Sequence, residues 1–201
     1  MLDQLEKYYS DRYPRIMGRL KSELLPQYFY HNTRHTEDVI HCTQIIGKFE
    51  GFSEEELAIL KIAALFHDTG FLSQRHRHEE AGAQFFLEDV NDELPQNFID
   101  QIVALILATQ MPQAPKNELE RVICDSDLDY LGRADFEEIG NDLFKEMEFC
   151  KEITAISEWD KLQIQFLEKH QFHTSYSREF REPIKQKHLL SLKSKLNFSN
   201  S

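Results

Sequence analysis

Residues 63–71 of the chain are Ala63-Ala64-Leu65-Phe66-His67-Asp68-Thr69-Gly70-Phe71. An apolar helical run ends there in adjacent histidine and aspartate residues, and a glycine follows. Because an unpaired buried charge is costly, two ionisable side chains at the end of so apolar a helix predict a charged group held between them. We therefore expect a metal site at His67 and Asp68. Taken alone, the pair is more typical of a capped helix end with a core histidine and a surface aspartate, so the surrounding sequence has to distinguish the two interpretations.

Two histidines extend the apolar stripes of two successive helices. In the helix expected over about 34–49, His35 lies four residues before the first member of the stripe, so it faces inward. In the next helix, which begins with a capping-box pattern at 53–56, His67 lies three residues after the last member. A short turn joins the two helices, so an antiparallel pair places both histidines at the same end. The stripes are Val39, Cys42, Ile46 and Phe49, then Leu57, Leu60 and Ala64.

A third helix, starting at about residue 118, carries an aspartate on its core face. Leu119 and Ile123 lie on one side of this helix, and four more residues bring the same side to Asp127. Asp125 points in another direction. Helical periodicity therefore favours Asp127 over Asp125 as an inward carboxylate.

Apolar residues spaced by three and four predict an all-α chain. Only seven glycines and six prolines interrupt the 201 residues, and one compact multi-helix domain over 1–201 is expected. Gly70 is expected to end the helix before it, and 69–77 and 111–115 are expected to be loops. Helices are expected over about 2–13, 14–28, 34–49, 54–67, 78–90, 95–109, 118–131 and 135–153, with two or three more in the C-terminal third.

The composition disfavours several partners. A net charge of −12 argues against a nucleic acid duplex or an anionic membrane, because both require a dense positive surface. No apolar run approaches the roughly 20 residues that span a bilayer, and the first residues lack the pattern of a signal peptide, so we expect a soluble, cytoplasmic protein. Cys42, Cys124 and Cys150 are widely spaced in apolar helical stretches, which favours reduced core thiols.

Two imidazoles and two carboxylates, from His35, His67, Asp68 and Asp127, form a ligand set for a divalent ion. This set fits Mn²⁺, Fe²⁺, Co²⁺, Ni²⁺, Zn²⁺ or Mg²⁺ and leaves positions for water if the ion is octahedral. Water on such an ion ionises near neutral pH, which provides a nucleophile. A second ion bridged by Asp68 fits the same set, so one or two ions are expected.

These residues, at these intervals, closely resemble the HD superfamily of metal-dependent phosphohydrolases. The resemblance covers roughly residues 28–135. It implies a compact helical bundle of the HD-domain and phosphodiesterase type, with His35, His67, Asp68 and Asp127 as metal ligands and Asp68 also among the catalytic residues. Three stretches carry it: Tyr30-His31-Asn32-Thr33-Arg34-His35-Thr36-Glu37-Asp38-Val39, Ala64-Leu65-Phe66-His67-Asp68-Thr69-Gly70, and Asp125-Ser126-Asp127-Leu128-Asp129-Tyr130-Leu131-Gly132.

The first of these stretches is also similar to the Tyr-His-Asn-x-x-His signature of class I cyclic-nucleotide phosphodiesterases. In those enzymes the earlier histidine donates a proton to the leaving alkoxide, and the resemblance implies this catalytic role for His31. Histidine suits the role because it titrates near neutral pH. A histidine that caps the helix or packs under the loop fits the sequence equally well.

Arg34, His76 and His78 are further candidates for contact with substrate. His76 and His78 follow the loop after Asp68, and the basic run 75–77 suits a phosphate. A solvated helix start explains the same residues, and Arg34 has the same two interpretations. In the C-terminal third we expect structural histidines and a solvated basic face: His170 and His173, then Arg178, Arg181 and Lys185.

Phe71 stands where some members of this superfamily carry an acidic residue. Its guanosine-tetraphosphate hydrolases follow His-Asp-Thr with an acidic pair, and some of its 5′-nucleotidases place a glutamate three residues after the aspartate. We therefore expect a hydrolase with general phosphoesterase activity on a small phosphorylated substrate, such as a nucleotide or cyclic nucleotide. The alternatives are a non-catalytic HD module that binds a nucleotide or partner protein and keeps a structural metal, and a helical interaction protein with no site.

Overall fold

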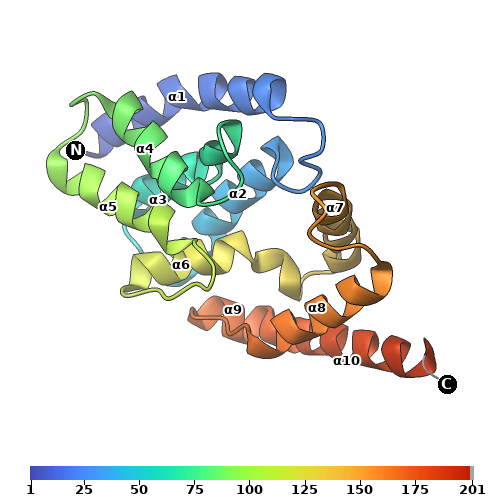
Figure 1. Cartoon of the computed structure of the whole chain (residues 1–201). Helices are drawn as coiled ribbons and strands as arrows, with labels where there is room; N and C mark the ends of the chain where they lie inside the picture. The colour runs from blue at the N-terminus through green and yellow to red at the C-terminus, as the bar shows by residue number, and fades with distance from the viewer. Residues whose placement is uncertain (200–201) are drawn as a thin grey trace.

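The computed structural model describes residues 1–199, and this part of the chain contains helices and no strand (Figure 1). The all-α architecture predicted from the sequence is confirmed. No helix among the described residues has both the length and the apolar character needed to cross a bilayer. The elements are α1 (Leu2–Glu23), α2 (Thr33–Phe49), α3 (Glu54–Phe66), the 3-10 helix η1 (Thr69–Leu72), α4 (His78–Val90), α5 (Gln96–Ala108), α6 (Glu118–Asp127), the 3-10 helix η2 (Asp129–Gly132), α7 (Phe136–Phe149), α8 (Ile156–Lys169), α9 (Ser175–Phe180) and α10 (Glu182–Ser199).

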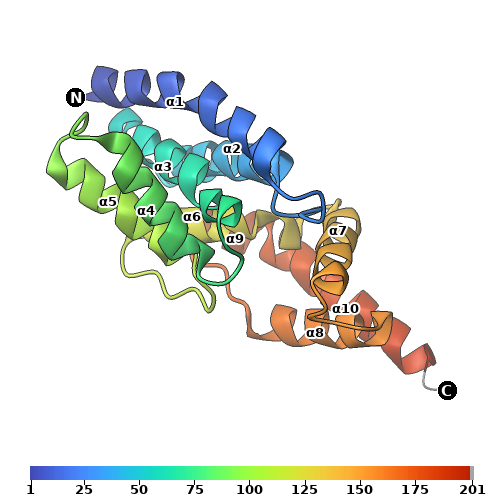
Figure 2. The ribbon, with the colours of Figure 1, turned by 45° about the horizontal axis from the view of Figure 1, so that its top comes forward.

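Helix α3 lies at the centre of the larger of two apolar cores. Most of its side chains from Leu57 to Phe66 are buried, and α1, α2 and α5 pack around it; Figure 2 shows α1 and α2 beside it. The predicted capping box starts the helix, since the Ser53 N–H donates to Oε2 of Glu56 at 2.8 Å. A helix that is apolar on nearly every side is stable only when it is enclosed, so α3 requires the surrounding helices.

The C-terminal helices form a second, smaller core. Helix α10 packs against α8, α9 and η2, and these helices lie on the far side of α6 from α4 and α5 (Figure 1). Tyr30 and Tyr130 belong to this core together with Phe136 and Leu167. Tyr30 precedes α2, so the second core also contacts the start of the helix that carries His35.

The expected helices at 2–13 and 14–28 are one helix, α1, with Pro14 inside it. A proline removes one backbone hydrogen bond from a helix interior. The buried stripe of α1 runs past the proline without interruption, and the burial of this stripe outweighs the lost hydrogen bond. Its members are Leu5, Tyr8, Ile16, Met17 and Leu20.

Gly70 does not end the preceding helix, contrary to expectation. Helix α3 ends at Phe66, and the expected loop begins with η1, in which Gly70 is buried. A Cβ atom on Gly70 would lie 1.9 Å from the backbone oxygen of His78. A glycine is therefore needed here because η1 and the start of α4 are in direct backbone contact.

Replacing Gly70 by alanine tests this contact. We expect Gly70→Ala to lower the free energy of unfolding by roughly 1–3 kcal/mol or more, because the added methyl group overpacks the interface. Gly18→Ala is the matched control, since a Cβ at Gly18 has nothing within 4 Å, and it should leave stability unchanged or raise it by about 1 kcal/mol. Urea unfolding of both variants measures the difference, and equal stability would contradict the packing argument.

Candidate metal centre

Four ionisable side chains from three helices meet at one point. His35 lies in the first turn of α2, whose N-terminus is capped by the side chain of Asn32. His67 follows the last residue of α3, and Asp68 comes directly after it. Asp127 is the last residue of α6. Because α2, α3 and α6 pack against one another, their ends bring these side chains together.

The spacing of the four side chains matches a ligand set. Nε2 of His35 lies 3.3 Å from Nε2 of His67 and 3.1 Å from Oδ1 of Asp127. Oδ2 of Asp68 lies 3.4 Å from Nε2 of His35 and 3.3 Å from Nε2 of His67. Ligand atoms at ~2.1 Å from a divalent ion are about 3.0 Å apart in an octahedron and about 3.4 Å apart in a tetrahedron. The ligand atoms of His35, His67 and Asp127 all lie within 4.8 Å of one another and form the group that could hold one ion, and Oδ2 of Asp68 adjoins both histidine nitrogens of that group.

One oxygen of this set lacks a hydrogen bond. Oδ2 of Asp68 is buried and accepts none, although a buried carboxylate oxygen normally has a donor. His67 is 1 % exposed and Asp68 5 % exposed, so bulk water does not satisfy them. A divalent cation between the imidazole nitrogens and the carboxylates would satisfy this oxygen, and the residues fit such an ion.

Neighbouring groups orient two of the ligands. Nδ1 of His67 lies 2.8 Å from the backbone oxygen of Ala64, so the N–H is on Nδ1 and the lone pair of Nε2 faces the centre. Nε2 of Gln113 donates to Oδ2 of Asp127 at 3.3 Å, which leaves Oδ1 of Asp127 directed at the histidines. Second-sphere contacts of this kind are typical of metal ligands.

Electrostatic coupling keeps the two carboxyl groups ionised. Burial opposes the charged form of Asp127, but hydrogen bonds with His35 and His67 lower its pKa to about 2. Burial also opposes the charged form of Asp68, but in the metal-free chain the positive charge of protonated His67, whose own pKa is raised by the two aspartates, outweighs burial and lowers the pKa of Asp68 well below its ordinary value. Both carboxylates are thus available as ligands at neutral pH.

His31 is held beside the centre by a buried glutamate. Its Nδ1 lies 2.5 Å from Oε1 of Glu146, whose Oε2 accepts the backbone N–H groups of Tyr30 and His31 at 3.0 and 3.1 Å. Nη1 of Arg75 donates to Oε1 of Glu146 at 2.6 Å. Burial opposes the charge of Glu146, yet the His31 and Arg75 contacts lower its pKa to about 2. Burial likewise opposes the charge of His31, but Glu146 and then Asp68 raise its pKa.

His78 faces the other oxygen of Asp68 and also contacts Glu79. Nε2 of His78 lies 3.5 Å from Oδ1 of Asp68 and 3.4 Å from Oε1 of Glu79. Nδ1 of His78 lies 3.1 Å from the backbone oxygen of Arg75, which directs Nε2 toward the carboxylates. Asp68 is therefore placed between two groups of ligand-type atoms.

Two predicted substrate contacts are not brought to the centre. Arg34 has a side chain that is 61 % exposed and pairs with Asp142 and Glu138 on α7. His76 is exposed, and its backbone oxygen accepts from Gln74. Neither lines the cavity next to Asp68. Both residues are close to the motifs in sequence, but Arg34 lies on an outward face of α2 and His76 lies in the loop before α4.

The basic face expected at the C-terminal end is partly buried, which corrects the sequence prediction. Lys185 is 1 % exposed and donates to the backbone oxygen of His170 at 2.7 Å. Arg181 pairs with the buried Asp129 at 2.7 Å. Asp125 is also buried, where it accepts the backbone N–H of Thr174 at 2.8 Å. Arg181 and Asp125 thus attach the C-terminal segments to η2 and α6, and Lys185 joins α10 to the end of α8; no local periodicity specifies these contacts.

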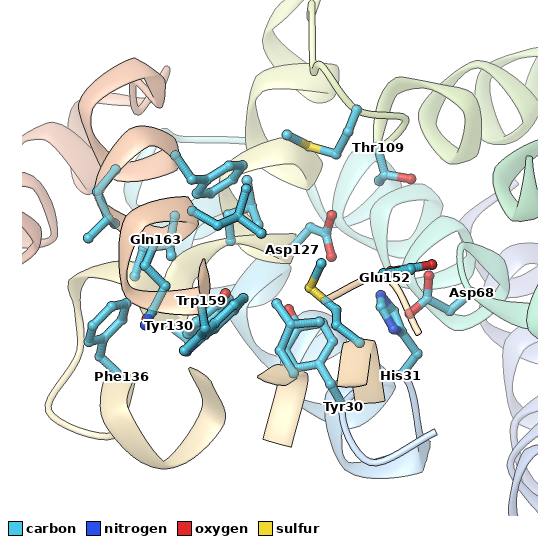
Figure 3. Close-up of a pocket in the computed structure, with 18 of the residues that line it drawn as sticks. Tyr30, His31, Asp68, Thr109, Asp127, Tyr130, Phe136, Glu152, Trp159 and Gln163 are labelled. Atoms are coloured by element: carbon cyan, nitrogen blue, oxygen red, sulfur yellow. The ribbon is translucent and has the colours of Figure 1, made fainter. Parts of the chain in front are cut away.

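A cavity of about 450 Å³ opens on the centre. Figure 3 shows Asp68, His31 and Glu152 at one end of it, with Trp159 and Phe136 at the other. Asp127 lines the wall between them. The centre is therefore accessible from one side, through a space large enough for a small molecule.

Sequence reasoning did not find Glu146, although a signal was present. Glu146 lies three residues after Leu143 and one before Met147 on α7, within the face expected to be buried. Its side chain is 0 % exposed. An acidic residue on an otherwise apolar helix face indicates a buried partner, but only the fold identifies that partner as His31.

Comparison of the chain with family models, with curated proteins and with solved structures finds no match. The functional argument therefore depends on the geometry of the centre and on the chemistry of its side chains.

Removal of one ligand tests the metal centre. We expect the wild-type chain, stripped with a chelator, to take up Mn²⁺ or Zn²⁺ in a calorimetric titration. His35→Ala should weaken that binding by roughly 100-fold or more. His41→Ala is the control, because His41 is an exposed histidine on the same helix, and it should leave the affinity unchanged. A wild-type chain that takes up no ion would contradict the site.

The pH dependence of stability tests the Glu146 contacts. The fall in the pKa of Glu146 from 4.5 to about 2 corresponds to about 3 kcal/mol of stability. Because the folded-state pKa is the lower one, this contribution is complete above pH 4.5 and is lost as the pH falls toward 2. Urea unfolding of the metal-free chain should show a smaller loss between pH 5 and 2 in Glu146→Gln than in the wild type. Equal losses would contradict the assignment.

Proposed function

We propose that this chain is a metal-dependent phosphohydrolase of the HD type, which cleaves a phosphate ester with water. One observation carries the proposal: the imidazoles of His35 and His67 lie within 3.1–3.6 Å of carboxylate oxygens of Asp68 and Asp127, and both aspartates line an open cavity. A bound divalent ion would supply Lewis-acid activation of water and of the phosphoryl oxygens. His35, His67, Asp68 and Asp127 would hold it.

The open side of the centre supports catalysis over a purely structural metal. Structural sites enclose their ion with protein ligands, whereas catalytic sites keep a position for water and substrate. Asp68 and Asp127 both line the cavity. This access favours the enzyme over a non-catalytic HD module, which was the alternative from the sequence.

His31 is the proposed proton donor. In hydrolysis the oxygen of water bonds to phosphorus, the bond from phosphorus to the alcohol oxygen breaks, and that oxygen needs a proton. Glu146 at 2.5 Å keeps the N–H on Nδ1, so a proton on Nε2 of His31 can pass to the departing alkoxide. His31 lies beside Asp68 at the edge of the cavity (Figure 3), next to the proposed position of the phosphate.

A second ion is compatible with the same arrangement. Nε2 of His78 lies between Oδ1 of Asp68, at 3.5 Å, and Oε1 of Glu79, at 3.4 Å, while Oδ2 of Asp68 faces His35 and His67. Asp68 would then bridge two ions, an arrangement that stabilises both the attacking and the leaving oxygen in phosphoryl transfer. His78 would serve as a ligand rather than as a substrate contact.

Substitution of His31 separates the proposed acid from the ligands. We expect the Mn²⁺-loaded chain to hydrolyse a generic phosphodiester or a member of a panel of nucleotides and cyclic nucleotides. His31→Ala should lower kcat by roughly 10²–10⁴-fold with bound metal unchanged, whereas Asp68→Ala should lose both metal and turnover. Metal analysis and initial rates measure the two effects.

Two results would count against these roles. Loss of metal in His31→Ala would show that His31 supports the ligands instead of donating a proton. A metal-loaded wild type without turnover on any phosphoester, indistinguishable from Asp68→Ala, would favour the binding module.

A further inference from the structure

The cavity has two chemically different ends. The end at Asp68 and His31 is polar, whereas the rest of the wall is formed mainly by apolar and aromatic side chains from η2, α7 and α8 (Figure 3). Tyr130, Phe136 and Trp159 provide flat aromatic surfaces there. A ligand that fills this space therefore combines one polar group with an apolar body.

The charges of the cavity limit the polar group to a small anion at the metal. Apart from two histidines, the charged residues among the described lining are all acidic, and none is lysine or arginine. Glu152 is neutralised by Arg75, with contacts of 2.7 and 3.0 Å. A chain of several phosphates would place its outer charges against acidic or apolar wall without a cation to pair them.

Apolar side chains continue from the cavity to its boundary with a second hollow. That hollow, of about 380 Å³, shares Met111, Leu162 and Phe166 with the cavity, and polar side chains, Lys169 among them, form most of the rest of its lining. Met111 is 49 % exposed and Leu162 38 % exposed, so apolar side chains mark the passage from the cavity to the surface. An elongated apolar group can continue along this passage while its phosphate stays at the centre.

We propose that the substrate is an ester with a single phosphoryl group on an uncharged, apolar alcohol, with the alcohol part lying between Tyr130, Phe136 and Trp159. The inference rests on the proposed function, because it takes the His35–Asp127 centre as the phosphate site. The inference excludes nucleoside polyphosphates from the substrate class. A nucleoside monophosphate also fits poorly, since its ribose hydroxyls would face an apolar wall.

Binding of alkylphosphonates tests this class without depending on turnover. Ethyl-, butyl-, hexyl- and octylphosphonate share one anionic group and are not hydrolysed. Calorimetric titration into the Mn²⁺-loaded chain should show affinity rising roughly threefold to fourfold for each methylene that enters the apolar space. Adenosine monophosphate and triphosphate should bind more weakly than octylphosphonate.

Surface variants locate the effect in the cavity. Leu162→Asp should remove most of the dependence on chain length while leaving metal content and ethylphosphonate affinity unchanged. Met111→Asp, in the loop at the same passage, should act in the same direction. Leu190→Asp is the control, because Leu190 is 65 % exposed and does not line either hollow, and it should resemble the wild type.

Affinity that does not change with chain length, or tighter binding of adenosine triphosphate, would overturn the inference on substrate class. A parallel hydrolysis assay, in which alkyl phosphates of the same chain lengths are added to the substrate panel, tests the proposed function separately. Chain-length dependence in a chain that hydrolyses no phosphoester would support the ligand class and overturn the hydrolase. Hydrolysis of a phosphoester by a chain whose phosphonate affinity does not change with chain length would support the hydrolase and overturn the ligand class.

Discussion

The burial of Asp68 beside the imidazoles of His35 and His67 is the constraint on which the site depends. Oδ2 of Asp68 has no hydrogen-bond donor, while Oδ1 faces His78. A carboxylate enclosed in this way needs positive charge on both sides. The histidines partly meet that need, and their nitrogens lie at distances suited to a shared cation. The arrangement fits the metal centre that we propose.

The packing of the helices brings the ends of α2, α3 and α6 together, and with them the residues around Asp68. Helix α3 is buried on nearly all sides, which holds His67 and Asp68 at its C-terminal end in a fixed position. Gly70 lets η1 contact the start of α4, and this contact places His78 near Asp68. Glu146 connects α7 to the segment before α2, because its carboxylate accepts the backbone N–H groups of Tyr30 and His31 and contacts the His31 ring. The cavity follows from the same arrangement, since the second core covers the centre without closing it.

Much of this arrangement could be predicted, and the failures have common physical causes. Periodicity placed His35 and His67 on core faces because apolar stripes repeat at the helical period. It missed the continuity of α1 through Pro14, where long-range burial outweighs a local penalty. It also assigned Lys185 to solvent, although its buried amine donates to the carbonyl of His170, beyond the end of α8. Such partners come from segments that the local pattern does not relate.

The sequence by itself determined the all-helical class and the four ligand-type residues, because helix phase is a local property written in the spacing of apolar side chains. Only the tertiary structure decided that Glu146 binds His31, that Arg34 and His76 face away, and that an apolar cavity without lysine or arginine in its described lining opens on Asp68. These features depend on contacts between residues far apart in the chain. Such contacts arise from the packing of whole helices, and no single helix encodes them.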